Sequence, residues 1–372
     1  MAFIRSTWKR LYAYLLRRDH FAPHPNARFE GFYSRTLLDD GGTLAVVFCW
    51  VKDAKQRPNL VHVSYTPAAN ALSAAFKHEF FPEHLEVASQ EQLANGRQPF
   101  TVHMSGVGTM TIGSESVQYT VNTSDPDLEL SLKVTNFIHW SNDIPLAGPM
   151  GPILLLSNLL PLNWHVLCTS SRASYAFSYA GKSQFGTGTS HVEKNWGKSF
   201  PPGWIWSQSF SSIGTKQEKS LCIAGGSALL GIQAYLVGYR SALLHWDFQP
   251  PFSMALWKLS PFMSVQHDSE AGTFSLTVRT FTRKLSIEVD TPNDSFIGIA
   301  CPYPDGHRPM HAFESFAGNT WIQAWGRKYP WQRWELLEEG SCGQSSEGLP
   351  CSALEFGGSL SHRVREAAEK ED

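Results

Sequence analysis

Residues 163–208 contain three runs, NWHVLCTS (163–170), HVEKNWG (191–197) and FPPGWIWSQ (200–208), around which the remainder of the chain is arranged. Between the first two runs lies a glycine-rich pair of predicted strands. Residues 191–208 hold an acid, a base, an amide and three tryptophans. Charged groups are rarely buried unless they are paired. Charges among such large aromatic side chains therefore indicate a cleft with a few placed polar groups.

On both sides of this stretch, short apolar segments separated by polar turns predict β-strands. DDGG at 39–42 predicts a hairpin turn, 181–188 is expected to be rich in turns, and 67–81 to be a short helix or an irregular crossing. Strands at this spacing are typical of an antiparallel sandwich or barrel. The expected strands are 28–33, 43–51, 60–65, 100–110, 116–122, 128–137, 174–180, 189–193, 221–224, 229–239, 243–248, 273–280, 284–290, 296–301 and 354–358.

The length of 372 residues favours two domains, because one hydrophobic core rarely serves so long a chain. The apolar segment 145–162 is interrupted by four prolines, and it lacks the run of about 20 apolar residues that a membrane span needs. We therefore interpret it as the linker between domains. The expected parts are a basic segment 1–27, a first domain 28–160, a second domain 161–360 and a polar, frayed tail 361–372.

The composition narrows the classes of function. Aromatic residues make up 13% of the chain, which favours an apolar ligand site, although a strand-rich sandwich also uses aromatics. The formal net charge is −2, and no basic block lies beyond the first eighteen residues, so nucleic-acid binding has no support. The six cysteines show no zinc-ligand spacing; Cys342 and Cys351 flank a polar loop and are either bridged or free. No nucleotide-binding loop or serine-hydrolase motif is present.

The first twenty residues carry five basic residues and no acid before Asp19. Ile4, Trp8, Leu11 and Leu15 recur at helical spacing, so the segment predicts an amphipathic helix. Such a helix binds a membrane surface, directs a protein to an organelle, or packs on the barrel as a terminal helix. We expect the protein in the cytoplasm or on a membrane face.

The central stretch resembles the tocopherol cyclase family, which belongs with carotenoid hydratases to a group of two-domain lipocalin-like proteins. The family motif EKNWG-x-x-FP-x-x-W-x-W-x-Q is matched by residues 193–208, and His165 stands where the family has a strand histidine. FEGFY at 29–33 is similar to the family's FEGWY, and Glu314-Ser315 to its final ES pair. The resemblance spans residues 28–358 and implies an all-β fold of two consecutive lipocalin-like barrels or sandwiches.

The resemblance also implies a reaction: an alkene is protonated, a phenol oxygen captures the tertiary cation, and a chroman ring closes. This chemistry needs a protonated acid in a dry place and aromatic faces for the cation, and neither a metal nor a cofactor is expected. The implied partner is a hydrophobic small molecule such as a prenylated phenol or another polyene. The alternatives are a hydratase, in which water captures the cation, a pericyclase, and a carrier that leaves its ligand unchanged.

We expect Glu193, His165 and Asn195 to be the catalytic residues. A buried carboxyl group has a raised pKa and keeps its proton near neutral pH, whereas histidine donates or accepts one there. The structural alternatives are an ion pair for Glu193, a satisfied core histidine and ordinary core aromatics. The expected substrate-binding residues are Trp164, Trp196, Trp204, Trp206, Gln208, Glu30, Tyr33, Glu314 and Asp247.

Two departures from the family pattern predict a reshaped pocket. Phe32 stands where the family has tryptophan, and Ser209-Phe210 follow Gln208 where the family has a polar pair. We therefore expect a cyclisation related to tocopherol synthesis rather than tocopherol synthesis itself.

Overall fold

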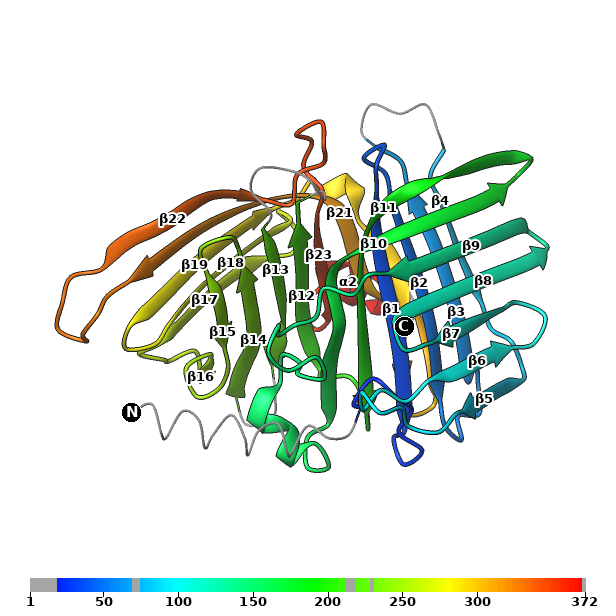
Figure 1. Cartoon of the computed structure of the whole chain (residues 1–372), viewed down its shortest axis with the longest axis horizontal. Coiled ribbons are helices and arrows are strands. Elements are labelled where there is room, and N and C mark those ends of the chain that lie inside the picture. Colours follow the sequence, from blue (N-terminus) through cyan, green and yellow to red (C-terminus); the bar gives the residue numbers. More distant parts are fainter. Residues whose placement is uncertain (1–18, 69–73, 212–218, 228–230, 370–372) are drawn as a thin grey trace. The chain divides into compact units, whose positions relative to one another are not determined.

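The structure is a computed structural model that describes residues 19–68, 74–211, 219–227 and 231–369. Almost all regular structure in these residues is β-strand (Figure 1). The described residues form two compact units: the first contains 19–67, 74–199 and 302–307, and the second contains Ala68, 200–211, 219–227, 231–301 and 308–369. The predicted all-β fold with two lipocalin-like parts is confirmed. The helix predicted in the first twenty residues falls almost wholly outside the described residues.

The first unit is built on one curled antiparallel sheet of eleven strands. Neighbouring strands follow the order β4-β3-β2-β1-β11-β10-β9-β8-β7-β6-β5, so β1 joins the two halves by pairing with both β2 and β11. The strands are β1 (Phe29–Leu38), β2 (Thr43–Val51), β3 (Asn59–Thr66), β4 (Phe76–Phe80), β5 (Leu85–Ser89), β6 (Phe100–Met104), β7 (Gly108–Ile112), β8 (Ser116–Ser124), β9 (Asp127–Thr135), β10 (Leu162–Tyr179) and β11 (Lys182–Gly197). A 3-10 helix, η1 (Gly151–Leu156), precedes β10.

The second unit has a twelve-stranded sheet whose main path is β15-β14-β13-β12-β23-β21-β19-β18-β17. Three strands lie off this path: β16 pairs with β14, and β20 and β22 pair with β21. The strands are β12 (Gly203–Phe210), β13 (Ser220–Ser227), β14 (Ile232–Arg240), β15 (His245–Phe248), β16 (Met254–Leu256), β17 (Met263–Asp268), β18 (Thr273–Arg279), β19 (Arg283–Asp290), β20 (Ile297–Tyr303), β21 (Gly306–Gly326), β22 (Glu335–Cys342) and β23 (Ser352–Gly358). A 3-10 turn, η3 (Asn293–Ser295), precedes β20.

Each unit has its own hydrophobic core on one face of its sheet. In the first, Phe32, Phe48 and Val192 belong to the buried core cluster, so even-numbered residues of β1, β2 and the end of β11 face it. In the second, Ile205 and Phe356 belong to the core cluster, so odd-numbered residues of β12 face that core. Because side chains alternate along a strand, these two assignments fix the direction of most motif side chains.

The units divide at residues 199 and 200, later in the chain than the expected boundary at 160 and 161. The reason is strand pairing: β10 pairs with β9 of the first sheet, and β11 pairs with β1. The EKNWG run therefore belongs to the first unit, and the WIWSQ run opens the second.

Several expected local features differ in the structure. Residues 76–80 form strand β4 rather than a helix or crossing, and 85–89 form a strand that was not expected. The expected strand 100–110 is a hairpin of β6 and β7. Residues 182–197 are one continuous strand rather than a turn-rich stretch followed by a strand. The expected frayed tail contains a short helix, α2 (His362–Glu369).

The six cysteines are free and buried, so the bridge between Cys342 and Cys351 that was left open is absent. Within the described ranges, no helix has the length and apolar character needed to cross a membrane.

Candidate functional site

Strand β11 carries the site because it lies in the middle of the first sheet, between β1 and β10. Its residues alternate between two faces. Lys194 and Trp196 point to the core face, which carries the first hydrophobic core, whereas His191, Glu193 and Asn195 point to the opposite face. The EKNWG run thus supplies two separate groups of side chains.

Lys194 is the centre of the group on the core face. Its side chain is fully buried, and Nζ lies 3.1 Å from Oε1 of Glu30. Nζ also donates to the carbonyl oxygen of Ala22 at 2.6 Å. The aromatic rings of Phe32 and Trp196 lie 4.8 and 5.4 Å from Nζ. The ammonium group is therefore held by a carboxylate, a carbonyl oxygen and two aromatic faces, the surroundings that a buried cation requires.

Glu30 completes this group through His24. The backbone N–H of His24 donates to Oε1 of Glu30, and the Nδ1 of His24 lies 3.1 Å from the same oxygen. Burial by itself would raise the pKa of Glu30, but the charge of Lys194 and the hydrogen bonds with His24 outweigh it and hold the pKa below its ordinary value. Glu30 is therefore an ionised partner of Lys194 rather than a proton donor.

Trp196 forms the edge of this group and the wall of a hollow. Its ring stacks on that of His24, with centroids 4.4 Å apart and planes inclined by 7°. A hollow of about 150 Å³ beside this stack is lined by both rings and by Asn163. The Nδ2 of Asn163 donates to the carbonyl oxygens of Ser157 and Trp196. Among the described residues, no donor reaches the buried Oδ1 of Asn163, so this oxygen remains available as an acceptor.

His165 also lies on the core face, where it is the cross-strand neighbour of Lys194. Its side chain is buried, and its pKa lies well below the ordinary value because of burial and the nearby charges of His20, Arg97 and Lys194. In the part of the chain that the structure describes, its Nδ1 has no hydrogen-bond partner. His165 is therefore a neutral core histidine, separated by the sheet from Glu193, the other side chain expected to transfer a proton.

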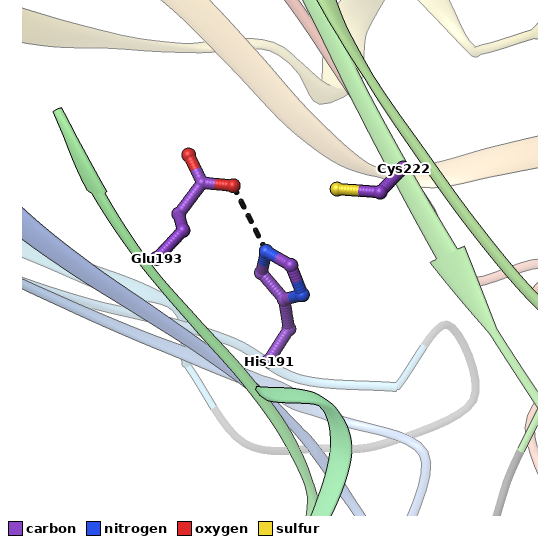
Figure 2. A group of neighbouring side chains, drawn as sticks. All are labelled: His191, Glu193 and Cys222. Atoms are coloured by element: carbon purple, nitrogen blue, oxygen red, sulfur yellow. Dashed lines mark hydrogen bonds and ion pairs between the residues drawn. The ribbon is translucent and has the colours of Figure 1, made fainter. Parts of the chain in front are cut away.

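On the opposite face, His191 and Glu193 form a hydrogen-bonded pair. The Nε2 of His191 lies 2.9 Å from Oε2 of Glu193, and both side chains are buried (Figure 2). The two residues are two positions apart on β11 and therefore share a face. A carboxyl group and an imidazole are the residue types that most often serve in general acid–base catalysis.

Three expected site residues lie on the same face as this pair. Tyr33 is the cross-strand neighbour of Glu193 on β1, and Trp164 is the cross-strand neighbour of Asn195 on β10. The face therefore carries a phenol, an amide and an indole as well as the His191–Glu193 pair. This arrangement brings Glu193, Asn195, Tyr33 and Trp164 together, and it separates them from Glu30, Trp196 and His165.

In the second unit, Trp204, Trp206 and Gln208 occupy the face of β12 that points away from the second core. The Nε1 of Trp204 donates to a carboxylate oxygen of Glu355. Glu355 is the cross-strand neighbour of both Trp206 and Glu314. The two tryptophans of β12 and these two glutamates therefore share one face of the sheet. The predicted aromatic surface of the WIWSQ run is thus accompanied by two carboxylates.

Asp247 lies apart from these residues. Trp246 and Phe248 point into the second core, whereas Asp247 points away and is exposed. Its Oδ1 accepts a hydrogen bond from Arg240 at 2.7 Å. Asp247 is therefore part of a surface ion pair, and the apolar neighbours that suggested a buried acid lie on the other face of its strand.

Two residues that contact the expected site residues in the structure, His191 and His24, were not predicted from the sequence. His191 was within the motif region, and its spacing of two from Glu193 on a strand was the signal that identifies it. His24 had no such signal, because its contacts with Glu30 and Trp196 join a loop to two separate strands.

Comparison with known proteins agrees with the motif. Residues 152–329 match the model of the family described as tocopherol cyclase-like, so the resemblance inferred from the motif is confirmed. The chloroplastic tocopherol cyclase of Zea mays is 23% identical over 202 residues, which cover 53% of this chain and 39% of the maize protein. The aligned region thus spans well under half of that relative.

Solved structures show a similar fold at low sequence identity. The crystal structure of CghA superposes with a TM-score of 0.57 at 9% identity, covering 91% of this chain and 94% of that one. The crystal structure of CghA with Sch210972 gives a TM-score of 0.53 at 9% identity and covers the same shares of the two chains. At this identity the similarity concerns the fold.

Proposed function

We propose that this protein is an enzyme that cyclises a hydrophobic, alkene-bearing small molecule by proton transfer, with a prenylated phenol or a related polyene as substrate. The observation that carries the proposal is the buried contact of 2.9 Å between His191 and Glu193. The match to the tocopherol cyclase-like family supports the reaction class. The CghA structure with Sch210972 supports a fold that accommodates a small molecule.

The proton balance of the reaction needs one group that first gives a proton and then takes one back. The His191–Glu193 pair donates its proton to an alkene carbon, which leaves a tertiary carbocation. The phenol oxygen of the substrate attacks this cation and closes the ring, and the phenol proton returns to the pair. The product has the same formula as the substrate, and the pair is restored.

The remaining side chains on this face supply orientation and charge stabilisation. Tyr33 and Trp164 present aromatic rings, whose faces attract a cation, and the amide of Asn195 can bind the substrate hydroxyl. In the second unit, Trp204 and Trp206 remain predicted substrate contacts. A hydratase would use the same pair, with water in place of the phenol oxygen, so the two activities differ in what captures the cation.

The experiment is a product assay with a panel of prenylated hydroquinones, analysed by mass spectrometry. We expect Glu193→Gln and His191→Gln each to lower turnover by about 10²- to 10⁴-fold, the usual contribution of a general acid or base. Glu129→Gln, which alters an exposed glutamate on β9, is the matched control and should retain full turnover. Equal turnover in all four proteins would contradict the assignment, and tight binding with every substrate recovered intact would favour a carrier.

A further inference from the structure

Three loops meet at one end of the second sheet: 257–262 between β16 and β17, 280–282 between β18 and β19, and 327–334 between β21 and β22 (Figure 1). The N–H of Arg279 donates to the carbonyl of Phe262 at 2.8 Å, and the N–H of Arg327 donates to that of Thr282 at 3.1 Å. The rings of Phe252, Phe262 and Phe281 pack edge to face with centroids 5.1–5.7 Å apart. This surface is termed the aromatic tip.

The aromatic tip exposes several large apolar side chains, and soluble proteins rarely expose a large group of such side chains together. Trp331 is 80% exposed, Leu259 77% and Trp257 72%. Phe281, Leu256 and Tyr329 are also exposed. Five of these side chains come from the three adjoining loops, and Leu256 is the last residue of β16 beside the first loop, so the exposed apolar residues are concentrated at one end of the sheet.

The backbone at Trp257 is held in a conformation that disfavours its side chain. Trp257 and Lys258 have φ angles of 49° and 66°, in the left-handed region. They are the two central residues of a tight hairpin closed by backbone hydrogen bonds between Leu256 and Leu259. Asparagine and glycine are preferred in such turns, and a bulky residue there costs conformational energy that is often associated with function. The turn presents the Trp257 indole to solvent at this cost.

Basic residues predominate around these side chains, and the nearest acid in the chain to the 327–334 loop is Glu335, which begins β22. Residues 249–267, 279–287 and 320–334 contain no aspartate or glutamate. The same ranges contain seven lysine and arginine residues, although the whole chain has a formal net charge of −2. The basic residues are Lys258, Arg279, Arg283, Lys284, Arg327, Lys328 and Arg333.

We propose that the aromatic tip docks onto a lipid bilayer that contains anionic lipids, with Trp257, Leu259 and Trp331 inserted among the headgroups. Tryptophan and tyrosine favour the membrane interface, and basic residues near an anionic surface each add to the binding energy. Exposed leucines have no role in stacking on nucleotide bases, so a bilayer fits this surface better than a nucleic acid. The surface belongs to the second unit, whereas the His191–Glu193 pair belongs to the first, and this proposal does not depend on the proposed reaction.

The test measures sedimentation of the full chain with vesicles of phosphatidylcholine alone and with vesicles that also contain phosphatidylserine. We expect binding to the anionic vesicles. Lys258→Gln/Lys328→Gln/Arg333→Gln should weaken it by about a hundredfold, and Trp257→Ser/Leu259→Ser/Trp331→Ser should abolish it. The matched controls alter exposed residues of the first unit: Phe185→Ser, an aromatic that is 82% exposed, and Lys133→Gln/Arg172→Gln/Lys182→Gln. Both controls should bind as the parent protein does.

Three results would overturn the proposal. The first is that the tip variants bind the anionic vesicles as tightly as the parent chain. The second is that binding is lost on replacing Arg5, Lys9 and Arg10 by glutamine while the tip variants retain it. The third is that neither kind of vesicle is bound. All tip substitutions are at exposed side chains, and circular dichroism of each variant verifies that its fold is kept.

Discussion

His165 and Glu193 project from opposite faces of the β10–β11 pair, because His165 is the cross-strand neighbour of Lys194 and Glu193 that of Val166. Both residues were expected to be catalytic, Glu193 as the acid and His165 as a proton donor or as the group that orients and deprotonates the phenol. The sheet separates them, and the partner of Glu193 is instead His191 on the same strand.

The first prediction concerns the role of His165 in turnover. We expect His165→Leu to retain activity within a few-fold of the parent protein, because the imidazole lies on the core face, away from the proposed proton-transferring pair. The measurement is the rate of product formation at saturating substrate. A loss as large as that of Glu193→Gln would show that His165 takes part in the chemistry.

The second prediction concerns the pH dependence of stability. Burial and nearby charges lower the pKa of His165 in the folded protein. As the pH falls through about 6.5, His165 therefore becomes protonated in the unfolded chain but stays neutral in the folded chain. The stabilisation is therefore present above about pH 6.5 and is lost as the pH falls towards the lower pKa of the folded state. In the parent protein, His165 should lower the free energy of unfolding by roughly 1–2 kcal/mol between about pH 7.5 and 5. His165→Leu should lack this part of the decrease, as measured by urea unfolding at both pH values. An unchanged decrease would contradict the neutral assignment.

The third prediction concerns the buried pair of Lys194 and Glu30. Lys194→Met leaves the Glu30 carboxylate buried without its cation, and loss of one partner of a buried ion pair costs about 3–5 kcal/mol. Urea unfolding measures this loss. The double variant Lys194→Met/Glu30→Gln should recover part of the stability, because no charge then remains. If the single variant were as stable as the parent protein, the pair would have no structural role.

The fourth prediction concerns the packing of the WIWSQ run. A Cβ atom at Gly357 would lie 1.9 Å from Cε2 of Trp204, so Gly357→Ala must displace the indole or the strand. Such overpacking costs about 1–3 kcal/mol. Gly113→Ala is the control, because the nearest atom to its added Cβ lies at 3.3 Å. Equal midpoints of thermal unfolding in the two variants would show that Trp204 is not fixed at this position.

Much of the fold followed from local sequence patterns. The apolar run at 43–51 and the alternation at 60–65 correspond to β2 and β3. The glycine-rich segment 181–188 misled the interpretation, because only Gly181 lies in a turn, whereas Gly186 and Gly188 mark close approach of other segments. A Cβ at Gly188 would lie 2.4 Å from the carbonyl oxygen of Leu37, and one at Gly186 would lie 3.2 Å from the Tyr175 ring. Contacts of this kind join distant segments and leave no local pattern.

The sequence predicts on which face of β11 the motif side chains lie, but not which residues of other segments they meet. Alternation along β11 was sufficient to separate Lys194 from Glu193 and to pair Glu193 with His191. The direction of His165 depends on the register of β10, which shifts between Val166 and Cys168. The contact of His24 with Glu30 depends on where the segment before β1 folds back. Both are properties of the assembled unit.

The central claim is that the His191–Glu193 pair delivers a proton to a substrate alkene. Its most direct test is cyclisation of a prenylated hydroquinone in heavy water, followed by mass spectrometry of the product. We predict one carbon-bound deuterium in the cyclised product of the parent protein and loss of that product in Glu193→Gln. A cyclised product without carbon-bound deuterium, formed equally by the parent protein and Glu193→Gln, would contradict the claim.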